Sequence, residues 1–493
     1  MRSISILSTA AGLLAAVAGV SGLPSNDGQF LVETAPGERR WVTRDEKMQM
    51  IAYSTNLRSL ALVDTKSEQE HKRFFDVTRY GDSVTPARLN ARTSPNYPTT
   101  PAQITRTNWA IAQVAPNDFI PDVTALTAFH TRYSESTTGV DAAKWVYQRA
   151  KNLFEEYGCF YGYGGPAVTK FQHANSSQFT TVATLRGTSN KTIVIGAHID
   201  SMDKKNPPGR APGADDNASG VSLILAALET LLKNPTIRGK HQPNTIEFHW
   251  YAGHENGKFG AAELWAAYSA QGRNVKAMLD QDIVGYFKPG TREEFGMITD
   301  FINPDLNEFL KMVIDQYTNL PYITFDCGFA CGDHGAPFMY GFPSAKVLES
   351  SLYNANPYIH TANDTANHLI YTHVYEHYKM VMGYLIELAF EDDLAKMGQP
   401  SLLGICALPE FRNHFDAIGG NLWPPPPGLR RNVLTLMTVS GKNKKGSVVT
   451  AGVAVGHDAN LYGYNATSNF MHEAGHTIDW NKRIVEEKEE RMV

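Results

Sequence analysis

A three-layer α/β domain with a largely parallel sheet is the fold class that the middle of this sequence predicts. Between about residues 100 and 392, short β-branched runs alternate with longer amphipathic or apolar segments. Strands that alternate with helices in this way build mainly parallel sheets with helices on both faces. With 42% apolar and 19% charged residues, the 493-residue chain has ordinary globular composition and room for two or three domains.

The predicted elements follow one another in chain order. A period of 3.6 or a continuous apolar run predicts helices over 140–157, 218–232, 304–317 and 371–390. Strands are predicted over 191–199, 245–252, 277–284 and 344–348. Sheets of this class bind ligands in loops beyond the strand ends, so functional residues are expected there.

Charge and cysteine content exclude several classes of protein. The chain carries 45 Lys and Arg against 50 Asp and Glu, a formal net charge of −5. Nucleic-acid binding needs a basic face, so nucleic acid is not expected as the main partner. Four cysteines exclude a disulfide-built scaffold, although they leave room for one local bridge.

The N-terminus has the pattern of a secretory signal peptide. Arg2 precedes an apolar run, and Ala16-Val17-Ala18 has the A-x-A spacing of a cleavage site. The run is short for a spanning helix of about 20 residues, so we predict a signal peptide over 1–18, secretion and no membrane partner. Sequons that fit a glycoprotein begin at Asn175, Asn190 and Asn465.

Composition also divides the rest of the chain. Residues 19–90 are polar and charge-rich, and we interpret them as a pro-segment, with a dispensable N-terminal domain as the alternative. A Pro-rich stretch at 93–101 lies at the start of the α/β domain, which we assign to 91–395. Residues 396–493 form an extra tail of different character, with a proline run at 424–427.

Histidine and carboxylate residues follow the predicted elements at positions where strands or helices end. Any one of them has an ordinary explanation as a cap or a core residue, so the prediction rests on the set. Imidazole and carboxylate ligands without thiolate suit catalytic zinc, and several acids in one pocket repel one another unless cations neutralise them. The set comprises His198 and Asp200 in GAHIDS, Asp215 and Asp216 in APGADDNASG, His254 and Glu255 in WYAGHENG, Asp282 in DQDIVGY, and His360 in NPYIHTANDT.

These motifs, together with DCGFACGDH, resemble the zinc aminopeptidases of the M28 family, in particular its secreted fungal leucine-aminopeptidase-like branch. The resemblance extends over about residues 31–391 and includes LVETAPGERRWVTRDEK. It implies a zinc-exopeptidase-like α/β/α domain with a mixed, largely parallel sheet, made as a zymogen. The expected protein is a monomeric metalloprotease that acts on peptides.

The same resemblance implies two Zn²⁺ ions. His198 and Asp282 would bind one ion, Glu255 and His360 the other, and Asp216 would bridge them. Asp200 would orient the imidazole of His198. Zinc would activate a bridging water, and the free α-amine of the substrate would bind a metal, which restricts cleavage to N-terminal residues, mostly bulky apolar ones.

Two covalent features are also implied. The family has a cis peptide after the bridging aspartate, here Asp216-Asn217, which makes the sequon at Asn217 a poor acceptor. Cys327 and Cys331 match a family disulfide, whose short loop suggests a role in loop shape. Cys159 and Cys406 have no obvious partners.

The sequence departs from the family at the general base. The family has Glu-Glu where this chain has His254-Glu255. His254 is therefore the expected catalytic base, but it could instead be an extra, inhibitory metal ligand, or mark an inactive relative. We expect greatly reduced hydrolysis, because removal of a positioned base costs about 10²–10⁴ in rate. Phe329 in place of Tyr and Gly332 in place of Ser are smaller departures.

The tail contains the pattern HExxH at His472, Glu473 and His476. On a helix this spacing places both histidines on one face as zinc ligands, with Glu473 as base. A third ligand has no persuasive position in the 17 residues that follow. We interpret the tail as a truncated fragment of another peptidase-like domain, from gene fusion or a faulty gene model; a functional second zinc site is the alternative.

Three functions therefore follow from the sequence. The first is a secreted zinc aminopeptidase that removes apolar N-terminal residues. The second is an inactive relative that binds metals and peptide N-termini. The third is an endopeptidase activity of the tail.

Overall fold

The structure is a computed structural model. It describes residues 29–35, 38–43, 46–47, 50, 75–76, 95–157, 161–162, 165–238, 242–391, 433–442, 448–456, 471–473 and 476–478. The chain divides into two compact units, one formed by Met1–Arg88 with Gly328–Ala330 and the other by the remaining residues. The predicted signal peptide, the sequon at Asn465 and the cysteines Cys159 and Cys406 lie outside the described residues.

The first unit contains a small antiparallel sheet in the region predicted to be a pro-segment. Its strands are β1 (Phe30–Ala35), β2 (Glu38–Val42) and β3 (Phe75–Asp76), in the order β2-β1-β3. Val32 and Val42 are buried together, and Phe30, Met50 and Phe329 pack against them.

An eight-stranded sheet forms the centre of the second unit, in the order β12-β11-β13-β10-β8-β9-β7-β6. The inner strands β13, β10, β8 and β9 are mutually parallel, whereas β6, β7 and the β11–β13 pairing are antiparallel. This confirms the mixed, largely parallel sheet. The strands are β6 (Val168–His173), β7 (Ser176–Leu185), β8 (Thr192–His198), β9 (Thr245–Tyr251), β10 (Val275–Gln281), β11 (Phe295–Ile298), β12 (Tyr322–Phe325) and β13 (Ser344–Leu348).

Strand β9 shows that helices cover both faces of this sheet. Trp250 points to one face, where its indole donates to the backbone carbonyl of Val221 in α6. The next residue, Tyr251, points to the other face and accepts a hydrogen bond from Trp265 of α8. Successive strand residues face opposite sides, so α6 and α8 lie on opposite faces and the three-layer prediction is confirmed.

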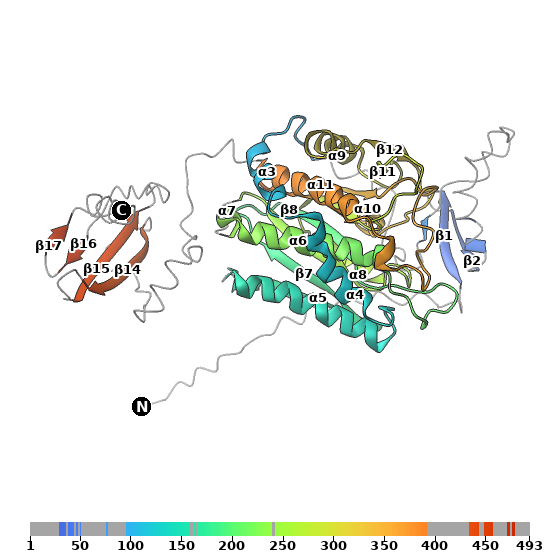
Figure 1. The fold of residues 1–493 in the computed structure, drawn as a ribbon, viewed down its shortest axis with the longest axis horizontal. Helices are drawn as coiled ribbons and strands as arrows, with labels where there is room; N and C mark the ends of the chain where they lie inside the picture. The colour runs from blue at the N-terminus through green and yellow to red at the C-terminus, as the bar shows by residue number, and fades with distance from the viewer. Residues whose placement is uncertain are drawn as a thin grey trace, which may run out of the picture. The chain divides into compact units, whose positions relative to one another are not determined.

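The main helices are distributed between these two layers (Figure 1). Helices α5, α6, α11 and α9 contact one another in sequence, and α8 contacts α10. Their bounds, with those of the shorter helices, are α3 (Ile104–Ile111), α4 (Ile120–Thr127), α5 (Thr137–Glu156), α6 (Gly220–Lys233), α7 (Pro235–Arg238), α8 (Phe259–Ala270), α9 (Pro304–Tyr317), α10 (Gly335–Met339) and α11 (Tyr371–Ala389).

Local sequence explains where the predicted helices begin. The side chain of Ser136 accepts a hydrogen bond from the amide of Gly139 and caps α5. Asn303 caps α9 in the same way, and Pro304 occupies its first turn, where a missing amide hydrogen costs nothing. Helix α6 is apolar and buried along nearly its whole length, as expected for a helix packed between a sheet and other helices.

The described part of the tail is made of strands. Strands β14 (Val433–Lys442) and β15 (Val448–Gly456) form one antiparallel pair. Strands β16 (Met471–Glu473) and β17 (His476–Ile478) form another, with Glu473 opposite His476. The helix expected for HExxH is therefore wrong, because His472 and His476 lie on two paired strands rather than one turn apart on a helix. In the described residues, no helix is long and apolar enough to span a bilayer.

Candidate metal centre

Parallel strands bring the predicted metal ligands to one edge of the sheet. His198 ends β8, Glu255 follows β9, and Asp282 follows β10. Asp216 lies in the irregular turn Ala214–Ser219 that leads into α6, and His360 lies in the loop after β13. The carboxyl ends of neighbouring parallel strands meet at this edge, which explains why residues far apart in sequence converge.

Asp216 stands between two groups of ligand atoms. Its Oδ1 lies 3.1 Å from Nε2 of His198, which is also 3.2 Å from Oδ1 of Asp282. Its Oδ2 lies 2.9 Å from Nε2 of His360, which is 3.3 Å from Oε2 of Glu255. The five predicted ligands thus form two adjoining clusters, with one oxygen of Asp216 directed to each.

The donor atoms of each cluster are close enough to share an ion. One group consists of His198, His254 and Asp282, the other of Asp216, Glu255 and His360, and within each group the atoms lie within 4.8 Å of one another. In addition, Oε1 of Glu255 is buried and has no hydrogen-bond partner in the described part of the chain. A buried carboxylate oxygen without a partner is costly, so these residues fit divalent cations, and the absence of thiolates suits zinc.

The electrostatics of the two groups favour positive charge. Burial opposes charge on His198, but Asp282, Asp200 and Asp216 outweigh it and raise its pKa well above the usual value. Burial likewise opposes charge on His360, yet Glu255 and Asp216 raise its pKa to about 10. A raised pKa means that protons and a metal ion compete for the same imidazole nitrogens, so metal binding at these positions should weaken as the pH falls.

Asp200 has a second task besides the predicted orientation of His198. Nδ1 of His198 donates to the backbone oxygen of Asp200 at 3.0 Å and lies 3.5 Å from its carboxylate. The carboxylate accepts hydrogen bonds from the backbone amides of His254 and Glu255, at 2.9 and 3.0 Å. Asp200 therefore fixes the backbone that presents a predicted metal ligand, Glu255, and the expected base, His254.

His254 is held between a carboxylate and another imidazole. Its Nδ1 lies 3.0 Å from Oδ2 of Asp333, and its ring stacks on His198 with centroids 4.0 Å apart. Its Nε2 faces the cluster, 4.0 Å from Oδ2 of Asp282. Because the carboxylate accepts a hydrogen bond from Nδ1, the lone pair of Nε2 is directed toward the cluster that contains Asp282. Asp333 was not anticipated from the sequence.

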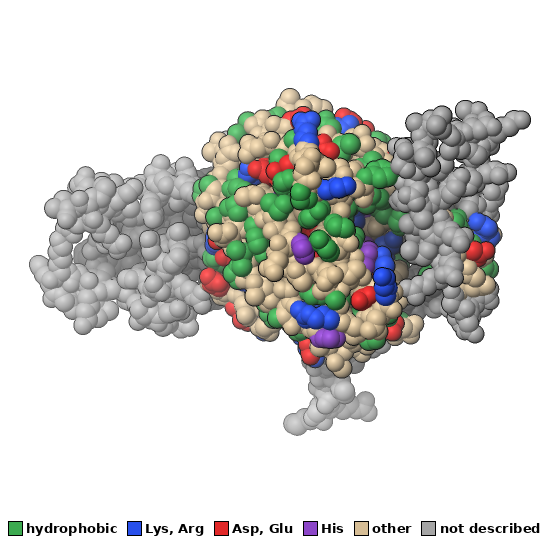
Figure 2. All heavy atoms as spheres, turned by 45° about the vertical axis from the view of Figure 1, so that its right-hand side comes forward, with side chains coloured by type: hydrophobic (Ala, Val, Ile, Leu, Met, Phe, Trp, Pro, Cys, Tyr) green, Lys and Arg blue, Asp and Glu red, His purple; other side chains and the backbone are tan. Residues whose placement is uncertain are grey.

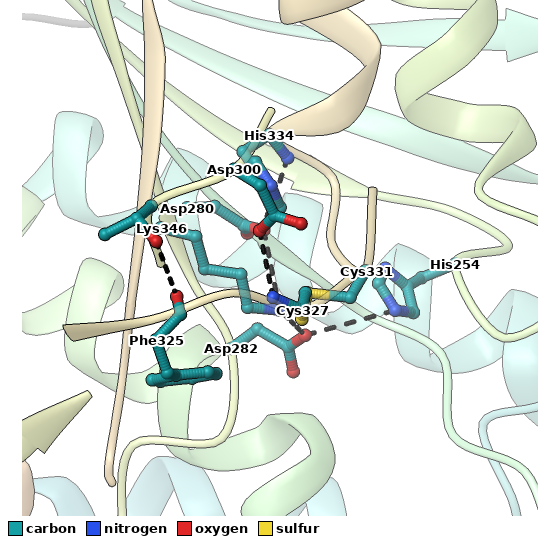
Figure 3. The surroundings of a disulfide bond; sticks show 10 residues. His254, Asp280, Asp282, Asp300, Phe325, Cys327, Cys331, His334 and Lys346 are labelled. Carbon is teal, nitrogen blue, oxygen red and sulfur yellow. Dashed lines mark hydrogen bonds and ion pairs between the residues drawn. A yellow bond between two sulfur atoms is a disulfide. The ribbon is translucent and has the colours of Figure 1, made fainter. Parts of the chain in front are cut away.

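Lys346 is a second unanticipated residue of the site. Its Nζ lies 2.5 Å from Oδ2 of Asp282 and 3.8 Å from Oδ2 of Asp280. Figure 3 shows the lysine running toward Asp282, while His254 approaches the same carboxylate from the other side. Burial opposes charge on Asp282, but Lys346 and His198 lower the pKa of this carboxyl far below its usual range.

Arg132 supports the backbone of two loops that carry predicted ligands. This fully buried side chain donates to the backbone carbonyl of Ile199, at 2.7 Å, and to that of Gly213, at 2.8 Å. Asp364 completes the support, because its carboxylate accepts hydrogen bonds from the amides of Asp215 and Asp216, both at 3.0 Å. A lone arginine before the first motif gives no sequence signal of such a role.

Several backbone features at the site agree with the expectations. The Asp216-Asn217 peptide is cis, and Cys327 is disulfide-bonded to Cys331. Ile283 and His360, each beside or within the ligand set, have left-handed backbone conformations with φ of 49° and 60°. Such conformations are uncommon for residues other than glycine and collect at functional sites.

On the face shown in Figure 2, acidic and basic side chains are scattered among apolar and neutral ones rather than gathered by sign. This mixture agrees with the small net charge of −5.

The chain is similar to a known peptidase family and to several known aminopeptidases. Residues 180–386 match peptidase family M28. A probable leucine aminopeptidase of Trichophyton verrucosum is 39% identical over 368 residues, 74% of this chain and 92% of that protein. Leucine aminopeptidase 1 of Arthroderma otae is 38% identical over 394 residues, 79% of this chain and 100% of that protein. The crystal structure of the LapA aminopeptidase of Legionella pneumophila matches with a TM-score of 0.57 at 25% identity, covering 71% of this chain and 91% of that one.

Proposed function

Since the chain belongs to peptidase family M28 and is a metallo-aminopeptidase, we propose that it is secreted and uses two zinc ions to remove bulky apolar N-terminal residues from peptides. The observation that carries the proposal is the position of Asp216. One carboxylate with an oxygen directed to each of two histidine-containing clusters is the arrangement that a pair of neighbouring cations requires.

Each ligand has a proposed place in this scheme. His198 and Asp282 hold one zinc, Glu255 and His360 hold the other, and Asp216 is shared. When bound, zinc polarises the scissile carbonyl, lowers the pKa of a water and offers a binding site for the free α-amine of the substrate. Because an internal peptide bond has no such amine, the scheme favours exopeptidase action.

His254 is the proposed proton acceptor. Its Nε2 lone pair takes a proton from the attacking water, and Asp333 stabilises the positive charge that then forms on the imidazole. The same Nε2 later returns the proton to the leaving amine. The rate is expected to be low, because an imidazole stands here in place of the glutamate expected from the family resemblance, and loss of a positioned base costs about 10²–10⁴ in rate.

An apolar cluster beside the ligands supports the substrate preference. Ile283 follows the ligand Asp282 directly, and Ile359 precedes the ligand His360. Ile283 is buried and Ile359 packs on the same cluster, whose other members include Ile298, Leu348 and the Cys327–Cys331 bridge. A side chain bound next to the metals would therefore meet aliphatic surface rather than charge.

A catalytically inactive metal-binding relative is the second candidate. The observation that favours it is that His254 belongs to the same donor group as His198 and Asp282. If Nε2 of His254 were a permanent ligand, no residue at this position would be free to accept the proton of water.

A hydrolysis assay on the full chain separates the two candidates. We expect slow release of p-nitroaniline from leucine-p-nitroanilide that stops with a zinc chelator and returns with added zinc. Zinc binding and bestatin binding without any turnover would instead establish the inactive relative. Turnover that survives complete zinc removal would refute the metal mechanism.

A further inference from the structure

Strand register places Lys346 against two buried carboxylates. Strand β13 pairs in parallel with β10, and Lys346 stands opposite Asp280. Asp282 lies two residues further along, and residues two apart near a strand point to the same side. Lys346 is only 2% exposed, so its ammonium must be neutralised within the protein.

The ammonium is directed at the metal ligand rather than at its register partner. Nζ of Lys346 is 2.5 Å from Asp282 but 3.8 Å from Asp280. Asp280 has other support from His334, whose backbone amide donates to it at 3.3 Å and whose ring Nδ1 lies 3.6 Å away. Asp282 thus faces two kinds of cation, with Oδ2 on Lys346 and Oδ1 toward His198 and the first metal position.

Gly332 provides the space for this ammonium. A Cβ at position 332 would lie 2.6 Å from Nζ and 2.7 Å from Cδ of Lys346, and would also collide with the carboxylate of Asp280. Real Cβ contacts are never this short, so a side chain at 332 would displace the lysine or the carboxylate. The unusual glycine after Cys331 is explained by this packing.

At the second metal position, no buried cation in the described part of the chain contacts a ligand side chain. Arg132 interacts electrostatically with Asp216 and Glu255, but its hydrogen bonds go to backbone carbonyls. The described residues contain no lysine or arginine ion-paired with Asp216 or Glu255, whose ion-pair partners are the two histidines. Lys204 does approach Nδ1 of His360 at 2.8 Å, but this lysine is exposed and contacts an imidazole, so solvent screens its charge.

We propose that Lys346 is a built-in cation that takes one oxygen of Asp282 and makes the His198–Asp282 zinc position much weaker than the Asp216–Glu255–His360 position. A buried positive charge beside a ligand disfavours a second cation there, and the low dielectric of the interior strengthens the effect. The inference rests on the proposed two-zinc function and adds that Lys346 is the residue that weakens one of the two positions.

Zinc titration of the metal-free full chain tests this, with a competing indicator chelator to measure both dissociation constants. The wild type should bind a tight and a weak equivalent that differ at least tenfold. Lys346→Met should strengthen the weak equivalent by about 10–100-fold, the size of typical effects of groups that contact metal ligands, and leave the tight one unchanged. Lys346→Gln removes the charge but keeps a donor for Asp282, and should do the same if Met disturbs folding.

Lys276 offers a matched control. It is also a buried lysine, on β10, and it pairs with Glu391 and donates to the backbone of Asn96 rather than to a metal ligand. Lys276→Met should leave both zinc constants unchanged. The same variants can also be loaded with Co²⁺ in place of zinc. Their absorption spectra then report the environment of each ion without depending on hydrolysis.

The outcomes are distinguishable. Two equal equivalents in the wild type, or an unchanged weak equivalent in a folded Lys346 variant, would overturn the inference while chelator-sensitive hydrolysis still upheld the proposed function. A wild type that binds no zinc would overturn both. A wild type that binds one equivalent, with a second appearing in Lys346→Met or Lys346→Gln, would support the inference.

Discussion

The carboxylate of Asp333 lies 3.0 Å from Nδ1 of His254 and so fixes which ring nitrogen faces the metal ligands. Asp333 is fully buried, and its other oxygen has no hydrogen-bond partner among the described residues. The pair gives position 254 a defined tautomer, which a histidine without such a partner would lack.

Replacement of His254 by glutamate should restore an efficient base. We expect His254→Glu to raise the turnover of leucine-p-nitroanilide at least tenfold, because it restores the carboxylate base that the family resemblance places at this position. Zinc content should be measured alongside, so that a change in metal binding is not mistaken for a change in chemistry. Unchanged or lower turnover at equal zinc content would mean that His254 is not an impaired base.

Replacement of Asp333 by asparagine should lower kcat about tenfold or more with little change in KM, because the amide stabilises the imidazolium less than a carboxylate does. The loss should disappear in the His254→Glu background, where no imidazole remains to be held. A double-mutant cycle with kcat as the readout measures this coupling. Equal losses in both backgrounds would show that Asp333 does not act through His254.

Removal of a ligand should cost metal as well as activity. Glu255→Gln and His360→Ala should each lower the zinc content of the purified protein by up to one equivalent, since both residues belong to the same donor group. Glu263→Gln is a suitable control, because Glu263 is an acid that pairs with His173 outside either donor group. Full zinc content in both ligand variants would contradict the assignment of this group as a metal position.

The fall in the free energy of unfolding at acid pH should depend on Glu247. Burial opposes charge on this residue, but His249 and Arg273 outweigh it and lower its pKa from 4.5 to about 2. A lowered pKa in the folded state contributes stability that is present above pH 4.5 and is lost as the pH falls toward 2. The shift corresponds to about 3 kcal/mol, so urea unfolding of Glu247→Gln should show a flatter loss of stability in this window than the wild type. Identical slopes would mean that Glu247 titrates normally.

Regular elements with a clear pattern were predictable from the sequence. The predicted helix over 304–317 and strand over 344–348 have the bounds of α9 and β13. Strand β7 was missed, because its buried face carries threonines and a glutamine instead of an apolar alternation. Helix α8 was missed because apolar residues lie on all of its faces, so its sequence shows no 3.6-residue alternation of apolar and polar positions.

The residues of the candidate site also fall into those that could be predicted from the sequence and those that could not. His198, Asp216 and Asp282 stand in ordered motifs at strand and helix ends, and such motifs can be recognised one at a time. Lys346 and Arg132 are single charged residues whose importance comes from complete burial, and burial of a lone charge has no signature in the sequence. The helix expected for HExxH failed because a three-position pattern does not determine secondary structure.

The close packing of Gly332 on Lys346 also couples these two positions. The first carbon of any side chain at 332 would meet the ends of Lys346 and Asp280, which would have to move aside. A larger residue beside the disulfide would thereby shift the ammonium away from Asp282 and alter a carboxylate that it does not itself touch.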